Sequence, residues 1–463
     1  MSYTTIFHSI KSEIKENLSL SVPLISAQLV YACSGFIATA FVARLGEDAL
    51  AASILVSMIW VSLHMLFFGL LNAISVLVSH QIGAKNYLGI SRIMGQSFLL
   101  GFVMMVLLVL TLLLLPLCFR WSAQPASVLK LANAYTHSLI WTVPGLVMLV
   151  ICEQFLAGIN RAKLVLRISL LVVPIEIPLI YVLMFGKLGL PAAGIAGIGY
   201  GFAVTYTMTT IVLVWYLLKS KSLQAFGLFK CIREWHPDYM KELIRVGLPM
   251  GFMHVIEISA FAVATFWIAQ FGTTLLAAHQ IVIQYLSFVI TAVFAMSQAV
   301  TIRVGYGVGA QDIDMVRTAS YVGMILSFFF IVCIMLAFIL KPDFFISFDL
   351  DIHKLANQEL VHDASALLSI CGVLLIFDNF RLIGFGALRG LKDTRFPMCA
   401  SIVSFWVIGL VLAYTFGFTL NFGGQGIWWG LVAGIASGAV IVLLRIKYFL
   451  KRADLNKIMS IKA

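Results

Sequence analysis

The sequence predicts an all-α integral membrane protein with twelve transmembrane helices in two pseudo-symmetric six-helix bundles. Of its 463 residues, 61% are hydrophobic and only 11% are charged, which is more apolar surface than a soluble domain can bury. The apolar runs are continuous over roughly 20 residues, the length that a helix needs to cross a bilayer. They do not alternate as barrel strands do, and the second half of the chain repeats the first.

Twelve apolar runs account for the predicted spans. They lie at roughly 20–42, 51–78, 93–119, 131–156, 164–184, 191–217, 243–271, 276–304, 319–340, 364–387, 396–416 and 425–449. An even number of spans places both termini on one side, and most Lys and Arg residues fall in the connections of that side. We therefore expect a multi-pass protein of the plasma (inner) membrane with both termini in the cytoplasm. The net charge of +11 does not indicate nucleic-acid binding, because the basic residues lie in the connections between apolar runs, as topology signals do.

An internal repeat organises the chain. The matched positions share an offset of 226 residues: Pro23 and Pro249, Gly46 and Gly272, Gly83-Ala84 and Gly309-Ala310. A fixed period of this kind indicates duplicated architecture. We predict an N-terminal six-helix lobe at 1–217, a cytoplasmic linker loop at 218–242 and a C-terminal six-helix lobe at 243–463, with substrate bound between the lobes.

Three acids lie well inside predicted spans: Glu176, Glu257 and Asp378. An acid at mid-span costs about 2.5–3.5 kcal/mol even on permissive scales, so each is a hypothesis for function. Glu176 stands between Pro174 and Pro178, which free backbone carbonyls that could help to coordinate a cation. The alternative for each acid is a protonated side chain with a structural role only.

Two further charged positions leave alternatives open. Arg381 follows Asp378 by three residues, a spacing that permits an ion pair along one helix face. Arg381 either neutralises Asp378 or acts as a built-in cation that an incoming ion displaces. Glu153 lies about two turns before Arg161 and Lys163, so we expect it to reach cytoplasmic water or to pair with those bases. The seven cysteines are scattered without metal-binding spacing, and we interpret them as small core residues.

Long motifs carry a resemblance to a known family. The stretches VGLPMGFMHVIEISAF, FGTTLLAAHQIVIQ and FDNFRLIGFGALRGLKD resemble the NorM-type branch of the multidrug and toxic compound extrusion (MATE) transporters. The resemblance implies an antiporter that exports organic cations, drugs or toxic metabolites by alternating access as Na+ or H+ enters. By motif it implies that Glu257 and Asp378 bind the coupling cation, as metal ligands if that cation is Na+. It implies no other cofactor.

The chain departs from the family pattern in one lobe. NorM-type proteins usually carry an acid in the first helix, in a GF-x-D-T context, where this chain has Ala38 in GFIAT. An alanine binds neither a proton nor a cation. We therefore hypothesise that Glu176 supplies the carboxylate that Ala38 lacks. Arg381 also departs from the pattern, where a neutral residue is usual.

The remaining expectations concern substrate and partners. We predict a substrate cleft that includes polar, aromatic and charged side chains: Gln28, Tyr31, Gln284, Ser287, Phe288 and Arg381. It would hold a small cationic or amphipathic molecule through cation–π contacts. We expect a monomer in contact with membrane lipid, and no enzyme. A lipid-linked saccharide flippase would need several cleft Arg or Lys residues, and a membrane acyltransferase would need paired His and Asp. The chain has no phosphate-binding GxxxxGK[ST] motif, so an ion gradient must drive transport.

Overall fold

A computed structural model describes residues 3–119, 124–452 and 455–459 of the chain. Within these residues the secondary structure is helical, with no strand. The helices of the first half are α1 (Tyr3–Ala43), α2 (Glu47–Leu71), α3 (Ala73–Gly83), α4 (Tyr87–Phe119), α5 (Ala126–Gly158), α6 (Ala162–Phe185), α7 (Ala196–Lys219) and α8 (Lys221–Gln224). Those of the second half are α9 (Pro237–Ile268), α10 (Thr273–Gly309), α11 (Ile313–Leu340), α12 (Pro342–Ile346), α13 (Gln358–Gly390), α14 (Arg395–Ser401), α15 (Leu410–Tyr414), α16 (Gly423–Arg452) and α17 (Leu455–Ile458).

Shorter helical pieces complete several spans. Two 3₁₀ turns, Ala269–Phe271 and Leu355–Asn357, extend α9 and precede α13. Two π-helical segments, Ile402–Gly409 and Thr415–Thr419, flank α15.

The prediction of twelve spans is confirmed. The described residues contain 12 helical stretches long and apolar enough to cross a membrane. Several extend beyond the predicted apolar run: the second covers Glu47–Gly83, where the sequence indicated 51–78. Helical hydrogen bonding continues past the ends of the apolar region, whereas the hydropathy pattern marks only the part suited to lipid.

Contacts between Cα atoms divide the described chain into two compact units. The N-unit is Ser26–Gly251, and the C-unit combines the chain up to Ile25 with Phe252 onward. The two boundaries, after Ile25 and after Gly251, are 226 residues apart, the same offset as the sequence repeat. Each repeat therefore contributes the beginning of its first helix to the other unit. The lobes proposed from the sequence, 1–217 and 243–463, are defined by the internal repeat. The two units are defined by which residues contact one another, so their bounds differ from those of the lobes.

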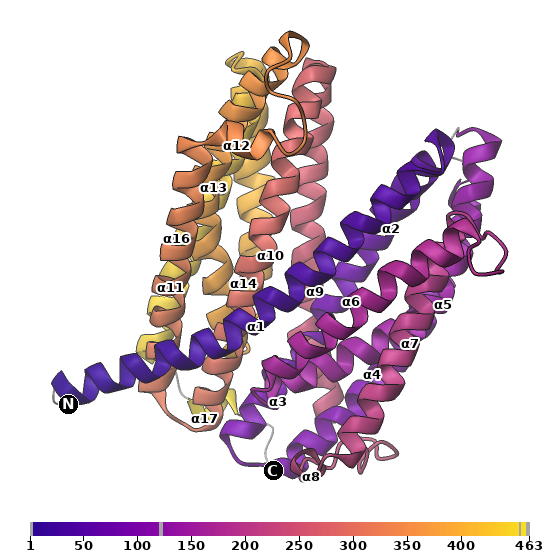
Figure 1. Ribbon diagram of the computed structural model, residues 1–463. Helices are drawn as coiled ribbons and strands as arrows, with labels where there is room; N and C mark the ends of the chain where they lie inside the picture. Colours follow the sequence, from indigo (N-terminus) through magenta and orange to yellow (C-terminus); the bar gives the residue numbers. More distant parts are fainter. Residues whose placement is uncertain (1–2, 120–123, 453–454, 460–463) are drawn as a thin grey trace. The chain divides into compact units, whose positions relative to one another are not determined.

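In the N-unit, α5 packs against α2, α3, α4 and α7, and α7 also packs against α6 (Figure 1). The beginning of α9 belongs to this unit and approaches α2 closely. A Cβ atom added to Gly69 would lie 2.6 Å from the Cα atom of Gly251, so only glycine permits this contact between backbones.

In the C-unit, α13 packs against α10, α11 and α16, which lie around it (Figure 1). The beginning of α1 is fixed to this unit by a bidentate ion pair. The Nε and Nη2 atoms of Arg303 donate to the two carboxylate oxygens of Glu13 at 2.8 and 2.6 Å. Both side chains are mostly buried, at 12% and 6% exposed. Two parallel hydrogen bonds in a buried position hold the helix in one orientation.

Candidate functional site

A cavity of about 400 Å³ lies inside the N-unit. Its walls come from α1, α2, α5, α6 and α7, and they carry polar and aromatic side chains together with two carboxylates. The charged, hydroxyl-bearing and aromatic members include Tyr31, Ser34, Trp60, His64, Tyr135, Glu153, Glu176, Phe202 and Tyr206. None of the described residues that line this cavity is Lys or Arg. The cavity therefore holds two acids, with no lysine or arginine among its described lining residues to neutralise them.

Glu176 on α6 is completely buried, at 0% exposed. The Ser34 hydroxyl on α1 donates a hydrogen bond to one of its carboxylate oxygens. The other oxygen, Oε2, is buried without a hydrogen-bond partner among the described residues. A buried carboxylate oxygen without a partner is costly as an anion, so this position suits a group that takes up a cation.

Ala38 lines the same cavity as Glu176. It lies four residues after Ser34 on α1, and residues at this spacing share one helix face. An acid at position 38 and an acid at position 176 would therefore serve one and the same cavity. This geometry fits the prediction that Glu176 supplies the carboxylate missing from α1.

Glu153 on α5 is part of this cavity, which sequence reasoning missed. The Tyr31 hydroxyl donates to its Oε1 atom at 2.8 Å. We expected Glu153 to reach cytoplasmic water or to pair with Arg161 or Lys163, and that expectation is wrong. Tyr31 and Glu153 are 122 residues apart, so no local pattern could have joined them. The signal that remained was the presence of an acid within an apolar run.

A second cluster of charges lies in the C-unit, where Arg381 binds both predicted coupling acids. Its Nε and Nη2 atoms donate to Asp378 Oδ1 at 2.8 and 2.6 Å, and its Nη1 atom donates to Glu257 Oε1. The side chains of Arg381 and Asp378 are each 2% exposed, and that of Glu257 on α9 is 15% exposed. The guanidinium thus links α9 and α13 through a buried ion pair with Asp378 and a partly buried one with Glu257.

Neighbouring groups hold Arg381 in this position. Its guanidinium carbon lies 5.1 Å from the ring centre of Phe385 and 4.9 Å from that of Phe405. These distances are typical of cation–π contacts. On α16, a Cβ atom added to Gly438 would lie 3.2 Å from Arg381 Cδ, so glycine leaves the space that the arginine fills. Arg381 is therefore a fixed part of the cluster.

A second buried arginine, Arg389, lies near the same cluster. It is 3% exposed, and its Nη2 atom donates to the Ser297 hydroxyl. Its guanidinium carbon lies 5.3 Å from the Phe294 ring centre. Two acids and two arginines give this part of the C-unit a formal charge balance.

The predicted cleft residues fall into different surroundings. Gln28 and Tyr31 line the cavity of the N-unit. Gln284 donates to Asp349 at 3.3 Å, and the exposed Ser287 donates to the carbonyl of Ile283 at 2.8 Å. Phe288 is partly buried on α10, and Arg381 is enclosed in the ion-pair cluster. The sequence-based grouping of these residues into one cleft remains a prediction.

Comparison with known proteins identifies the family of this chain. The profile of the MatE family matches residues 23–182 and 249–415, one match in each repeat. The chain belongs to the MatE family. Within this family it is a multi-pass membrane transporter and not an enzyme.

Full-length relatives of this MATE protein have NorM names. A Synechocystis protein named "Probable multidrug resistance protein NorM" is 30% identical over 442 residues, covering 96% of each chain. A Burkholderia vietnamiensis protein named "Multidrug resistance protein NorM" is 31% identical over 448 residues, again covering 96% of each. The resemblance to the NorM branch is thereby confirmed.

Solved MATE structures share the fold. A crystal structure of a MATE protein in the straight conformation superposes with a TM-score of 0.84 at 20% identity, covering 96% of this chain and 97% of that one. The eukaryotic MATE transporter AtDTX14 superposes with a TM-score of 0.80 at 20% identity, covering 97% and 98%. At these identities the likeness supports the twelve-helix fold alone.

Proposed function

We propose that this MATE protein is a multidrug efflux antiporter that exports cationic, aromatic compounds and is driven by inward proton movement. Glu176 is the coupling group, and Glu153 shares its cavity. The single observation that carries the proposal is a cavity inside the N-unit with two carboxylates and no lysine or arginine among its described lining residues. Such a cavity attracts positive charge, whether a proton or a cationic substrate.

Competition for the same carboxylates couples the two fluxes. A substrate cation and a proton cannot both neutralise Glu176, so binding of one favours release of the other. Such differential binding to two conformations is what an alternating-access exchanger requires. The protein then exchanges one positively charged species for another without needing ATP.

The surroundings of Glu176 favour a proton over Na+ as the coupling ion. Its only hydrogen-bond donor among the described residues is the Ser34 hydroxyl, and its Oε2 atom has no partner. A proton satisfies one oxygen directly, whereas a bound metal cation needs several oxygen ligands around it. Na+ coupling is the competing outcome, and the experiment below separates the two.

The walls of the cavity suit an aromatic cation. Trp60, Phe202 and Tyr206 line it together with the two acids. Aromatic faces attract organic cations, and a volume of about 400 Å³ falls in the range of drug-sized ligands. A lipid-linked saccharide carries phosphates and would need lysine or arginine side chains, which the described lining lacks.

Glu257 and Asp378 have a different role in this proposal. Their guanidinium partner Arg381 is already in place as a cation, so they stabilise the C-unit and do not take up the coupling ion in each cycle. The sequence-based assignment of Na+ ligands to these two acids is thus replaced by an internal ion pair. The position in the inner membrane, the cytoplasmic termini and a monomeric state belong to the same proposal.

Transport in reconstituted vesicles tests the proposal. Purified protein is placed in vesicles with an imposed pH gradient or an imposed Na+ gradient, and ethidium movement is measured. We expect the pH gradient alone to drive wild-type transport. We expect Glu176→Gln to reduce that transport about tenfold or more, in the range of typical coupling energies.

Two controls make the outcomes distinct. Glu257→Gln removes an acid of the other cluster and is expected to retain pH-driven transport in its folded fraction. Transport driven only by the Na+ gradient would contradict proton coupling. Ethidium movement that follows neither gradient would contradict antiport altogether, and unchanged transport by Glu176→Gln would remove Glu176 from the mechanism.

A further inference from the structure

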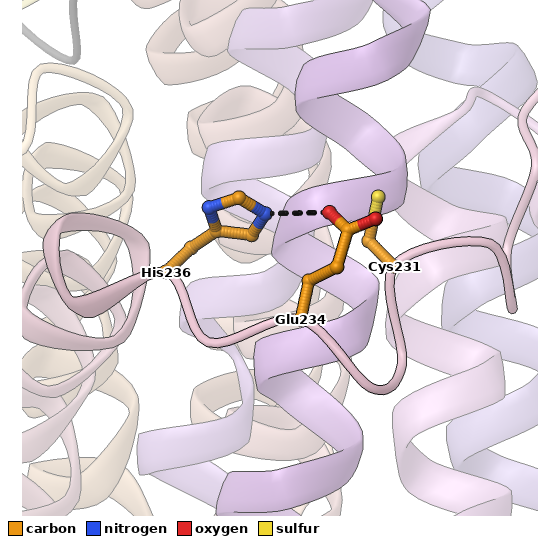
Figure 2. A group of neighbouring side chains, drawn as sticks. All are labelled: Cys231, Glu234 and His236. Atoms are coloured by element: carbon orange, nitrogen blue, oxygen red, sulfur yellow. Dashed lines mark hydrogen bonds and ion pairs between the residues drawn. The ribbon is translucent and has the colours of Figure 1, made fainter.

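A cluster of three potential metal ligands lies in the segment between α8 and α9, outside the sites described above. Cys231, Glu234 and His236 point toward one another, with the Glu234 carboxylate between the thiol and the imidazole (Figure 2). One ligand atom from each residue lies within 4.8 Å of the others. Cys231 is buried, His236 is partly buried and Glu234 is exposed. This convergence was not expected from the cysteine spacing, which indicated no metal ligand.

We propose that Cys231, Glu234 and His236 form a three-ligand Zn2+ site. A thiolate, an imidazole and a carboxylate are the donors that Zn2+ takes in proteins, and three protein ligands leave a fourth position for water. A thiolate is a poor ligand for Mg2+ or Ca2+, which prefer oxygen only. The ion would replace the hydrogen bond that now joins His236 Nε2 to Glu234 Oε2 at 2.9 Å.

The ligand atoms need only a small adjustment to bind the ion. Zinc bond lengths of about 2.0–2.3 Å place tetrahedral ligand atoms roughly 3.3–3.8 Å apart. The three atoms now lie within 4.8 Å of one another, so movements of about an ångström close the site. Glu234 is exposed and His236 is partly buried, so rotation of these two side chains supplies that movement.

The backbone that carries the ligands is already fixed to α4. The Gln96 side-chain amide donates to the carbonyl of Glu234 at 2.7 Å. A Cβ atom added to Gly95 would lie 2.8 Å from the carbonyl carbon of Cys231, which shows how closely the segment lies on the helix. Two residues before Cys231, the ring of Phe229 stacks on that of Phe98 of α4, with ring centres 5.2 Å apart. Such pre-positioning lowers the entropy that metal binding must overcome.

The charges around the cluster are compatible with a divalent ion. Burial and the neighbouring Glu234 raise the pKa of the Cys231 thiol, whereas Arg92 and Lys230 act in the opposite direction. A metal ion displaces the thiol proton when it binds, and it also neutralises the repulsion between thiolate and carboxylate. These two groups together carry two negative charges, which balance Zn2+.

The place of the cluster in the chain gives the ion a structural role. A bound ion would join both ends of the segment Cys231–His236 directly before Pro237, the first residue of α9. The site would therefore stabilise this connection between the repeats.

Zinc binding to purified full-length protein tests the site. The probe is Zn2+ alone, measured by calorimetry on protein in detergent after treatment with a chelator. We expect one high-affinity ion per chain. Cys231→Ser and His236→Gln should each weaken binding by about tenfold or more, because each removes a direct ligand. The matched control Cys33→Ser, which removes another cysteine of the N-unit, should bind Zn2+ as the wild type does.

A second measurement keeps the result independent of folding and of transport. Lys230, directly before the segment, and Arg233 within it are exposed trypsin sites, and Zn2+ should slow cleavage there in the wild type. Glu234→Gln should lose much of this protection while its uncleaved fold is retained. Equal Zn2+ affinity in all variants, or cleavage that Zn2+ does not slow, would overturn the site. Neither readout depends on the proposed proton-coupled export, so each proposal can fail alone.

Discussion

The two units treat buried carboxylates in opposite ways. In the N-unit, Glu176 and Glu153 receive hydrogen bonds from the neutral hydroxyls of Ser34 and Tyr31 beside a cavity. In the C-unit, Glu257 and Asp378 are bound to a guanidinium that is 2% exposed. The two repeats thus contain one acidic pair with hydroxyl donors, which we propose takes up a mobile cation, and another whose cation is part of the chain.

The comparison indicates what decides whether a buried acid is available for transport. A carboxylate with a permanent ionic partner is stabilised, and its ion need not be exchanged. A carboxylate that has only a hydroxyl donor lacks such a partner, and we propose that a proton supplies the missing charge at Glu176. The sequence indicates how deep an acid lies in its span. Depth does not distinguish a carboxylate with an ionic partner from one with only a hydroxyl donor, because most of these partners come from other helices.

Removal of the internal cation should give the largest effect. Arg381→Gln leaves Glu257 and Asp378 buried without their guanidinium. Breaking a buried ion pair by removing one partner typically costs about 3–5 kcal/mol, and we expect a loss of stability of that size. Because Na+ can neutralise the two unpaired charges, it should restore part of the loss. Thermal unfolding in detergent, with Na+ compared with K+ at equal ionic strength, measures both effects.

A double variant serves as the control for this prediction. Arg381→Gln combined with Glu257→Gln removes one acid together with the arginine, and we expect it to lose most of the Na+ response. An Arg381→Gln protein as stable as the wild type in the absence of Na+ would show that the two units do not differ as argued.

An acid placed on α1 should be able to replace Glu176 in the cavity of the N-unit. Ala38 and Glu176 line the same cavity, so Ala38→Asp in the Glu176→Gln background replaces the carboxylate within it. We expect pH-driven ethidium transport to recover to within about tenfold of the wild type, since coupling energies span that range. Ala38→Asn in the same background is the matched control and should not restore transport. Equal rates for the two variants would mean that position 38 cannot serve as the acid.

Ser34 should have a smaller effect. Ser34→Ala removes the hydroxyl that donates to Glu176. The usual net contribution of one hydrogen bond is about 1 kcal/mol, and we expect the protein to lose about that much stability at neutral pH. Thermal unfolding measures the change. Ser53→Ala removes a hydroxyl from the same cavity and is the comparison variant. If both variants lose equally, the effect does not arise from Glu176.

The smallest effect is expected at Glu153. Glu153→Gln keeps an oxygen that can accept the Tyr31 hydrogen bond, so it removes the charge and keeps the contact. Because the hydrogen bond is kept and only its charge assistance is lost, we expect a change of about 0.5 kcal/mol, or roughly twofold in the KM for ethidium. A loss of transport as large as that of Glu176→Gln would make Glu153 an equal partner in coupling.

The sequence predicted the spans well because they depend on local composition. Each helix satisfies its own backbone, so an apolar run of sufficient length identifies it without knowledge of its neighbours. The depth of Glu176, Glu257 and Asp378 followed from the same runs. The ion pair of Asp378 with Arg381 was also one of the open alternatives, since three residues separate them on α13.

Contacts across helices were not accessible from the pattern. Arg381 and Glu257 are 124 residues apart, and Tyr31 and Glu153 are 122 apart. Which of several helices faces a given acid depends on rotation about the helix axis, and apolar residues on all sides leave that rotation undetermined. For this reason Glu153 was predicted to reach cytoplasmic water or to pair with nearby bases, and the second partner of Arg381 was not foreseen.

The beginnings of α1 and α9 each belong to the unit formed mainly by the other repeat, which has a consequence for the folding of separated halves. A cut in the loop between α8 and α9 would produce two fragments, and neither would contain a complete unit. One fragment would lack Pro237–Gly251, and the other would lack the residues up to Ile25. We expect each fragment to be degraded when made alone and to be rescued when both are made in the same cell. On this expectation each repeat folds stably only in the presence of the other.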